Sequence, residues 1–419
     1  MPPAGLRSMR RAAAHVSLIG SREQCAATRA LHLHCLAIVR ETGTRRGEMM
    51  TTRRTLISQA MALIAMQKLG TGAAAHGASA TSAIDPAPRK LDLLFLGGTG
   101  FLGPHQIEYA LARGHRVTMF NRGVSGAGMY GDRVEALLGN RDSRIDAGLS
   151  ALEGKRRWDA VIDNSGYIPR HVRDSAELLK GRVTRYLFVS TLSVYDPAAE
   201  DRVDETTPLS KSPGSTEEMS WTNYGPLKAD CDRAVRETQG EAATVVRPGF
   251  IVGPGDDSDR FTYWVDRVAR GGDVLGPPDR ERALQWVDVR DLCPWIVDLA
   301  ERDRGGVFNA VGPESRTSWG QVIEVLAKGS SAPVRVRWPT AALLEEMKVE
   351  LPLVSSTRRP RYFEGGAARA AGLRDRPLED TAGATLAWWR AQTPERRAQA
   401  DGWPTPEQER AVIARIVGS

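Results

Sequence analysis

The stretch between Leu91 and Arg122 constrains the fold of this chain more than any other segment. It begins with the apolar run 91–96 (LDLLFL) and continues through the glycine-rich sequence GGTGFLG at 97–103. A helical pattern follows at 103–113, and then a second apolar run at 116–121 (RVTMFN). Short apolar runs bounded by glycines are typical of buried parallel strands. This order of elements predicts a nucleotide-binding unit at the start of a parallel sheet.

The glycines form the pattern G-x-x-G-x-x-G at Gly97, Gly100 and Gly103. Glycine permits a tight turn, lets the backbone approach a pyrophosphate, and allows the helix to pack closely on the strand. The amino terminus of the helix adds free N–H groups and the positive end of its dipole. We therefore expect the turn to bind a dinucleotide, the alternative being a purely structural turn. The residues expected to contact the cofactor here are Gly97, Gly98, Thr99, Gly100, Phe101, Leu102 and Gly103.

The second strand ends in Asn121 and Arg122. An acidic residue at this place would bind the free 2′-hydroxyl of NAD. A guanidinium instead suits a 2′-phosphate and stacking on adenine. We expect NADP rather than NAD, with a plain surface role for Arg122 as a further alternative.

Strands and helices continue to alternate after this unit. Strands are expected at 133–138, 158–163, 185–190 and 243–247, and helices at 172–179 and 224–237. The pattern predicts an α/β fold of the Rossmann type, a doubly wound parallel sheet with right-handed crossovers. We expect a dinucleotide-binding domain at 91–249. Residues 250–419 are expected to form a smaller α/β substrate-binding region with C-terminal helices.

The net charge of +6 and pI near 9.2 suggest at first a nucleic-acid partner. Residues 1–80, however, contain 11 Lys and Arg against 3 acidic residues, so the remaining chain has a net charge of about −2. No nucleic-acid partner is therefore expected. Of the four cysteines, only Cys231 and Cys293 lie beyond the basic segment, and neither belongs to a metal-binding pattern. We expect two buried thiols and no metal site, with a disulfide or a reactive thiol as the alternative.

The basic segment has the organisation of an export signal at 49–80. Arg53 and Arg54 precede an apolar run at 56–66, and the segment ends in Ala-Ser-Ala at 78–80. Paired arginines before a weak apolar core are typical of twin-arginine signals, which predicts a periplasmic or secreted protein that uses the twin-arginine export machinery. The run is shorter than the roughly 20 residues of a membrane span, so no stable membrane insertion is expected. A disordered basic tail on a cytoplasmic protein is the alternative. Residues 1–48 are interpreted as unstructured or as an overcalled start, and 81–90 as a linker.

A Y-x-x-x-K pattern at Tyr224 and Lys228 opens the helix expected at 224–237, so both side chains lie on one face. A phenol is a poor acid–base at neutral pH unless a nearby cation stabilises the phenolate. Ser190 and Thr191 end a strand, where a hydroxyl is able to bind the same substrate oxygen. Together they predict a redox site in which a tyrosine moves the proton.

In these motifs and their order the chain resembles the extended short-chain dehydrogenase/reductases, the NAD-dependent epimerase/dehydratase family. The segment 253–264 and the Asn-Arg-Gly ending of the second strand are closer to a divergent branch that is similar to the chloroplast stem-loop RNA-binding proteins. The matching motifs are GGTGFLG (97–103), DNSGY (163–167), VSTLSVY (189–195), YGPLK (224–228), RPGFIVGPGD (247–256) and VDVRDL (287–292).

By this resemblance Tyr224 is the general acid–base and Thr191 orients the substrate oxygen. Lys228 lowers the pKa of Tyr224 and binds the nicotinamide ribose. The resemblance also implies cofactor contacts from Asn164, Ser165 and Gly166, and from Pro248 to Ile251.

The substrate implied is small and polar, with a hydroxyl or a carbonyl. Nucleotide-sugar epimerases often have a phosphate-binding arginine where this chain has Leu284, which argues against a nucleotide sugar unless Arg282 substitutes. Further candidate pocket residues, each with a structural role as the alternative, are Asp256, Arg260, Tyr263, Trp264 and Arg290. Trp388 and Trp389 are expected in the core rather than at a ligand.

Three functions remain open from the sequence. The first is an NAD(P)-dependent oxidoreductase, epimerase or dehydratase. Export would require its cofactor to be tightly bound and recycled in place, which favours epimerisation or dehydration. The second is a redox-silent cofactor-binding scaffold or sensor. The third is an RNA-binding protein of the chloroplast stem-loop-binding type.

Overall fold

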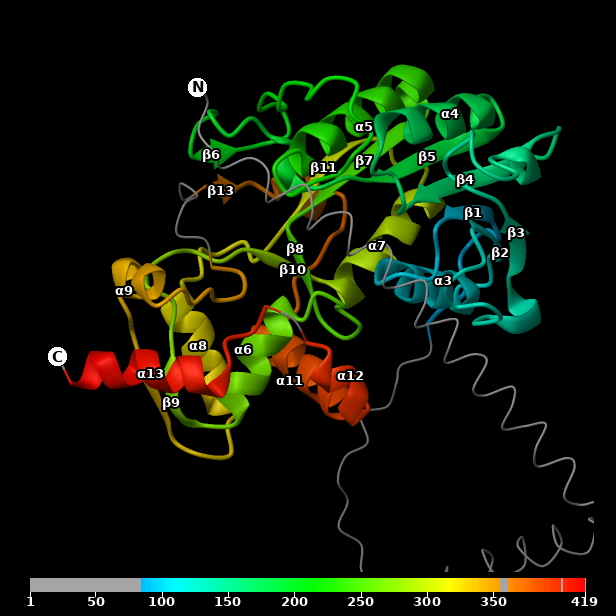
Figure 1. Cartoon of the computed structure of the whole chain (residues 1–419). Helices are drawn as coiled ribbons and strands as arrows, with labels where there is room; N and C mark the ends of the chain where they lie inside the picture. Colours follow the sequence, from blue (N-terminus) through cyan, green and yellow to red (C-terminus); the bar gives the residue numbers. More distant parts are fainter. Residues whose placement is uncertain (1–83, 355–360, 401, 419) are drawn as a thin grey trace, which may run out of the picture. The chain divides into compact units, whose positions relative to one another are not determined.

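A computed structural model describes residues 84–354, 361–400 and 402–418, and its centre is a parallel sheet of seven strands (Figure 1). The strand order is β11-β7-β5-β4-β1-β2-β3. The chain builds outward from β1 to β2 and β3, and then returns to β4 on the other side of β1. This is the doubly wound arrangement, with its switch point between β1 and β4. The predicted fold class is confirmed. The predicted signal, the overcalled start and the beginning of the linker lie outside the described residues.

The sheet strands match the apolar runs of the sequence with small shifts at their ends. Gly131–Arg133 forms a short 3-10 helix, so the third strand begins two residues later than expected. The strand β5 begins at Val183 because it pairs with Trp158 of β4 from its first residue. The strands are β1 (Asp92–Leu96), β2 (Arg116–Asn121), β3 (Glu135–Leu138), β4 (Trp158–Asp163), β5 (Val183–Val189), β7 (Ala243–Pro248) and β11 (Gly306–Ala310).

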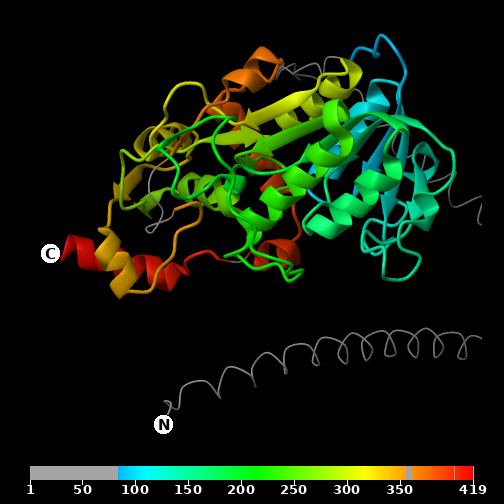
Figure 2. The same ribbon diagram turned by 90° about the horizontal axis from the view of Figure 1, so that it is seen from above.

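Two pairs of helices cover the two faces of the sheet (Figures 1 and 2). The helices α3 (Leu102–Ala112) and α7 (Val289–Glu301) pack on one face, against side chains such as Leu93 and Phe95 of β1. The helices α4 (Pro169–Leu179) and α5 (Tyr224–Gln239) pack on the other, against Leu94 and Leu96. Alternate residues of β1 thus face opposite layers, and both layers are apolar.

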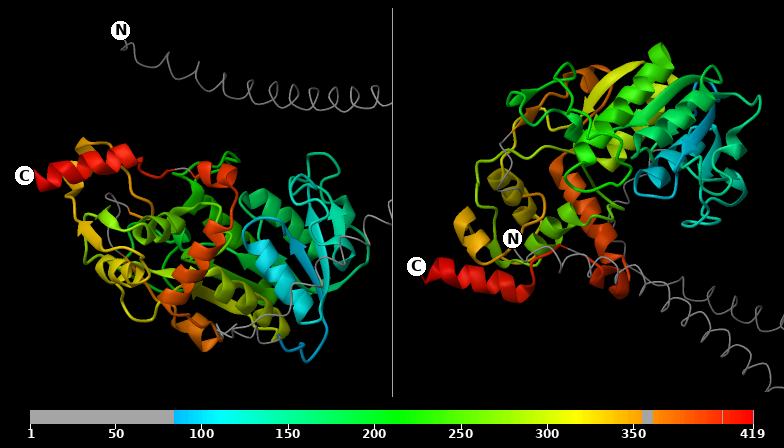
Figure 3. Two further views of the ribbon diagram at one scale, coloured as in Figure 1. Left: turned by 90° about the horizontal axis from the view of Figure 1, so that it is seen from below. Right: turned by 45° about the horizontal axis from the view of Figure 1, so that its top comes forward.

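The smaller C-terminal region mixes short helices with two-stranded sheets (Figure 3). It contains its own apolar core. Tryptophans and Tyr263 pack edge-on or tilted against one another in this region, with ring centroids 4.8 to 5.5 Å apart. Its elements are α6 (Arg260–Ala269), β9 (Gly272–Leu275), α8 (Trp319–Lys328), β12 (Val334–Arg337), α9 (Ala341–Glu346), α11 (Leu378–Arg390), α12 (Pro394–Ala398) and α13 (Pro406–Val417).

Parts of the chain beyond residue 250 pack with the predicted dinucleotide-binding domain. The seventh strand, β11, pairs with β7 and lies at the edge of the sheet. The strand β13 (Tyr362–Phe363) pairs with β6 (Arg202–Val203), and α10 (Gly366–Ala370) contributes Ala368 to the core under α7. The domain boundary at 249/250 therefore stays a prediction, and the sheet extends across it. The pair β8 (Phe250–Val252) and β10 (Trp286–Asp288) links the two regions.

Cys231 and Cys293 are both free and buried, as predicted. Among the described residues, no helix is long and apolar enough to cross a bilayer.

Candidate active site

The glycine turn follows β1 at the switch point of the sheet, and its glycines have different roles. Gly97 has a φ of +79°, which favours glycine over any L side chain. A Cβ on Gly103 would lie 2.3 Å from the carbonyl carbon of Gly98, so only glycine lets α3 pack on the turn. A Cβ on Gly100 would meet nothing within 4 Å. Gly100 therefore faces open space at the amino end of α3, where a pyrophosphate is expected.

A buried tyrosine stabilises the glycine turn. The Tyr130 hydroxyl donates a hydrogen bond of 2.6 Å to the carbonyl oxygen of Gly98, and the ring is 5% exposed. Sequence reasoning missed this residue because it lies in an irregular loop, 32 positions from its partner.

The segment after β4 faces the glycine turn across the switch point. The Asn164 amide donates to Gln106 Oε1 at 2.6 Å, and Ser165 Oγ donates to the carbonyl oxygen of Leu96 at 3.0 Å. A Cβ on Gly166 would lie 2.5 Å from the Phe188 ring, so this glycine is explained by packing. Asn164 and Ser165 therefore lie beside the turn, as a shared cofactor site requires.

A buried ion pair fixes this segment. Arg141 donates two hydrogen bonds of 2.6 and 2.9 Å to the Asp163 carboxylate, and a third of 3.0 Å to Ser165 Oγ. Tyr186 also donates to Asp163, at 2.9 Å. Asp163 is fully buried at the last position of β4, so these hydrogen bonds compensate its charge. Arg141 was missed because nothing in its local sequence marks it.

Asn121 is the last residue of β2 and Arg122 follows it, at the same end of the sheet. Asn121 Oδ1 accepts a hydrogen bond of 3.0 Å from the Gly123 backbone, so its side chain closes the turn after the strand. The Arg122 side chain is exposed and forms no ion pair within the described residues. Its guanidinium is thus available to a ligand, which is compatible with the predicted contact to a 2′-phosphate.

Tyr224, Thr191 and Lys228 come together at the carboxyl ends of β4 and β5. Thr191 follows β5, and the amino end of α5 packs closely on the turn 192–194, because a Cβ on Gly225 would lie 2.3 Å from the Ser193 carbonyl oxygen. This approach brings Tyr224 near Thr191, whose hydroxyl acts to lower the pKa of the Tyr224 phenol. Lys228 Nζ donates to the carbonyl oxygens of Gly166 and Val189 at 2.7 and 2.8 Å.

Burial dominates the electrostatics of these groups. It raises the pKa of the Tyr224 phenol, while the Thr191 hydrogen bond and the Arg260 guanidinium act in the opposite direction. Burial lowers the pKa of Lys228 to about 8, because the ammonium loses its hydration. The cation that acts on Tyr224 here is therefore Arg260, and the lowering of its pKa by Lys228 stays a prediction.

The remaining predicted residues lie partly beside the main sheet and partly in the core of the C-terminal region. Pro248 is buried at the end of β7, and Ile251 packs against the core under α7. Tyr263 and Trp264 are core residues of the C-terminal region, as their structural alternative has it, and Leu284 is buried in the same core.

Two polar candidates are also structural. Arg290 donates to Asp288 at 2.7 Å and to Asp380 at 3.2 Å, and Asp256 accepts from Ser258. Trp389 is 3% exposed and packs on Trp403, as expected for the core.

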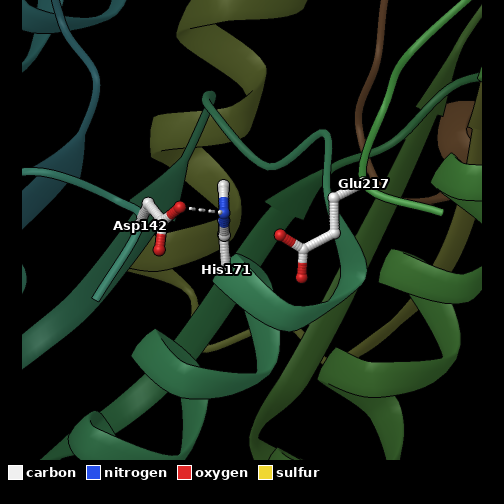
Figure 4. Close-up of side chains that lie close together, drawn as sticks. All are labelled: Asp142, His171 and Glu217. Atoms are coloured by element: carbon white, nitrogen blue, oxygen red, sulfur yellow. Dashed lines mark ion pairs between the residues drawn. The ribbon is translucent and has the colours of Figure 1, made fainter. Parts of the chain in front are cut away.

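A cluster of Asp142, His171 and Glu217 also offers ligand atoms within 4.8 Å of one another (Figure 4). The Arg170 guanidinium lies among them, 2.9 Å from Asp142 and 2.6 Å from Glu217. A cation would have to displace this guanidinium. The cluster is therefore explained as an ion-pair network.

A hollow of about 660 Å³ lies at the amino-terminal ends of the strands, beside the first residues of β7 and β11. It contains none of the predicted site residues. Ligands of doubly wound sheets bind outside the carboxyl ends of the strands, so we place the site at those ends and not at this hollow.

The residues at the carboxyl ends of the strands fit a dinucleotide. Gly100 leaves space at the helix amino terminus, and buried polar atoms nearby have no hydrogen-bond partner among the described residues, namely Asn164 Oδ1, Gln106 Nε2 and Ser190 Oγ. The strand order and the glycine turn define a protein of the Rossmann class. Residues 93–311 match the model of the NAD dependent epimerase/dehydratase family, and the chain belongs to this family.

Individual relatives are distant. The epimerase family protein SDR39U1 of Bos taurus is 23% identical over 258 residues, which cover 59% of this chain and 83% of the relative. The chloroplast stem-loop binding protein of 41 kDa b of Arabidopsis thaliana is 24% identical over 260 residues, 58% of this chain and 64% of that protein. The expected similarity to the latter is thus confirmed. The structure of the Bordetella bronchiseptica enzyme WbmG, in complex with NAD, has a TM-score of 0.54 at 18% identity and covers 73% of this chain and 96% of that one.

Proposed function

We propose that this chain is an NAD(P)-dependent oxidoreductase, epimerase or dehydratase that acts on a hydroxyl or carbonyl of a small polar, sugar-like molecule. The observation that carries the proposal is that Thr191, at the end of β5, and α5, which bears Tyr224 and the buried Lys228, meet at the end of the sheet that also bears the glycine turn. The NAD bound by WbmG, a protein of similar fold, supports the same cofactor class.

Each residue has a role that follows from its place. The glycine turn would bind the pyrophosphate, with Asn164, Ser165 and the segment Pro248–Ile251 beside the remaining cofactor. The bound cofactor supplies a hydride donor or acceptor. Tyr224 moves the proton at the substrate oxygen, and Thr191 holds that oxygen in place. Lys228 has three N–H donors, and its two carbonyl contacts leave one for a ribose hydroxyl.

We favour NADP, since the exposed Arg122 guanidinium stands where an acid would bind the 2′-hydroxyl of NAD. We also propose that the signal at 49–80 exports the folded protein with its cofactor already bound. Mass spectrometry of the nucleotide released from the purified full-length chain tests the choice of NADP and the tight binding that export of a loaded protein requires. A chain that carries no nucleotide and binds NADP only weakly would contradict tight binding.

The catalytic proposal is tested with Tyr224→Phe. The loaded protein is offered a panel of sugars, sugar acids and nucleotide sugars, and the nicotinamide absorbance and product formation are followed. General acid–base catalysis contributes about 10² to 10⁴ in rate, so the variant should lose at least about a hundredfold while still binding the cofactor. Unchanged turnover in Tyr224→Phe would refute the catalytic role of Tyr224, and absence of turnover by the wild type across the panel would leave the scaffold or sensor function as the better explanation.

The similarity to a chloroplast stem-loop binding protein favours RNA binding as a second candidate. The net charge of residues 81–419 argues against it, because phosphate binding needs a basic surface. Retention of residues 81–419 on RNA that weakens steeply with salt would support this second function.

A further inference from the structure

Arg260 is the first residue of α6, and its side chain is exposed. Its Nε donates a hydrogen bond of 3.0 Å to Ser258 Oγ, and Ser258 in turn donates to Asp256 at 2.6 Å. The guanidinium lies over the ring of Phe250, 5.4 Å from the centroid. One edge of the guanidinium is therefore fixed, while its two terminal nitrogens have no hydrogen-bond partner within the described residues.

The arginines around it are used differently. Arg267 pairs with Glu409 at 2.6 Å, Arg290 with Asp288 at 2.7 Å, and Arg396 with Asp259 at 2.8 Å. Each of these guanidinium groups has a carboxylate that neutralises it. Within the described residues Arg260 has no such ion-pair partner, although acidic side chains are close in sequence. A planar fork that is held in position, with no carboxylate within ion-pair distance among the described residues, is suited to a carboxylate or a phosphate.

The position of Arg260 connects it to the proposed active site. The loop before α6 packs against the amino-terminal part of α3, which follows the glycine turn, since the Pro254 carbonyl oxygen is 2.9 Å from His105 Nε2. Gly249, directly before Phe250, lies against Leu192, the neighbour of Thr191, because a Cβ on Gly249 would be 3.4 Å from Leu192 Cδ1. Arg260 also lies near enough to Tyr224 to lower the pKa of its phenol.

We propose that Arg260, over the Phe250 ring, binds an oxyanion of the substrate, a carboxylate or a phosphate carried near the hydroxyl on which Tyr224 acts. The substrate is then an acidic hydroxy or oxo compound rather than a neutral sugar. This inference rests on the proposed function, because it places the anion relative to Tyr224. The Phe250 ring covers the apolar part of the substrate and holds the guanidinium flat.

The test uses the full-length protein saturated with NAD or NADP, so that the glycine turn is occupied. Malonate and inorganic phosphate are titrated separately by calorimetry at constant ionic strength, into the wild type, Arg260→Gln and Arg157→Gln. Arg157 is an exposed arginine with no ion pair within the described residues, and it precedes β4 at the opposite edge of the sheet, so its variant removes the same charge away from the site.

We expect saturable binding of at least one anion to the wild type and to Arg157→Gln, and a tenfold or greater loss of affinity in Arg260→Gln. Preference for malonate indicates a carboxylate substrate, and preference for phosphate a phosphorylated one. Absence of saturable binding, or equal affinity in Arg260→Gln, overturns the inference. Failure to bind either nucleotide contradicts the proposed function instead. The titrations are then repeated without nucleotide, and the comparison of Arg260→Gln with wild type still decides the anion site.

Discussion

Two glycines of the same turn should respond in opposite ways to the addition of one methyl group. In Gly103→Ala the new Cβ would lie 2.3 Å from the Gly98 carbonyl carbon, about 1 Å closer than an ordinary contact. The backbone of β1 or α3 must move, and overpacking of this kind costs about 1–3 kcal/mol. In Gly100→Ala the Cβ meets nothing within 4 Å, and the backbone does not have a positive φ. Its free energy of unfolding should stay the same or rise by about 0.4–1 kcal/mol, since alanine restricts the unfolded chain.

Cofactor binding should separate the two variants further. The methyl group of Gly100→Ala would occupy the space where we expect the pyrophosphate, so its Kd for NAD or NADP should rise at least about tenfold, or 1.4 kcal/mol. Urea unfolding measures the stability of each variant, and titration of the nicotinamide fluorescence measures its affinity. Wild-type affinity in Gly100→Ala would refute the placement of the pyrophosphate. A Gly103→Ala variant as stable as wild type would refute the close packing of α3 on the turn.

Three further changes test the polar groups of the site. We expect the free energy of unfolding of the wild type, relative to Lys228→Met, to rise by up to about 3 kcal/mol between pH 8 and 10.5, because the unfolded lysine binds a proton there that the folded one has lost. Urea unfolding at both ends of this pH range measures the difference. Parallel pH profiles of the two proteins would contradict the expectation. Arg122→Gln should lower the affinity for NADP at least about tenfold relative to that for NAD, and an unchanged ratio of the two Kd values would favour the surface role. Arg141→Met leaves the Asp163 carboxylate buried without its cation, so the free energy of unfolding at pH 7 should fall by about 3–5 kcal/mol. A loss below about 1 kcal/mol would show that Tyr186 and backbone groups suffice for Asp163.

The fold was predictable because its signals are local. Apolar runs such as 158–163 are too short for helices, and each is bounded by turn residues, so strand positions follow from composition. The strand β11 was missed because the run 306–310 (GVFNA) is only partly apolar and pairs with β7 across nearly 60 residues of intervening chain. Such pairing depends on the tertiary structure and leaves little trace in one sequence.

The candidate site shows the same division. Tyr224, Thr191 and Lys228 could be identified because parallel strands bring their carboxyl ends to one edge. Tyr130 and Arg141 could not be identified, since each lies in an irregular loop and binds a partner more than 20 positions away in the sequence. Among the pocket candidates, Tyr263 and Trp264 are aromatic, and aromatic residues occur in cores as well as in pockets. Only the surroundings distinguish Arg260, with its unpaired terminal nitrogens, from the ion-paired Arg290.

The two carbonyl contacts of Lys228 have a consequence for how its variants are interpreted. Its ammonium joins the segment after β4 to the end of β5, so it fastens together two parts of the chain that must separate when the sheet opens. A chain without this lysine loses a crosslink of the scaffold together with a partner for the cofactor. Reduced activity in a Lys228 variant is therefore ambiguous, whereas Tyr224→Phe removes one hydroxyl and leaves this crosslink in place.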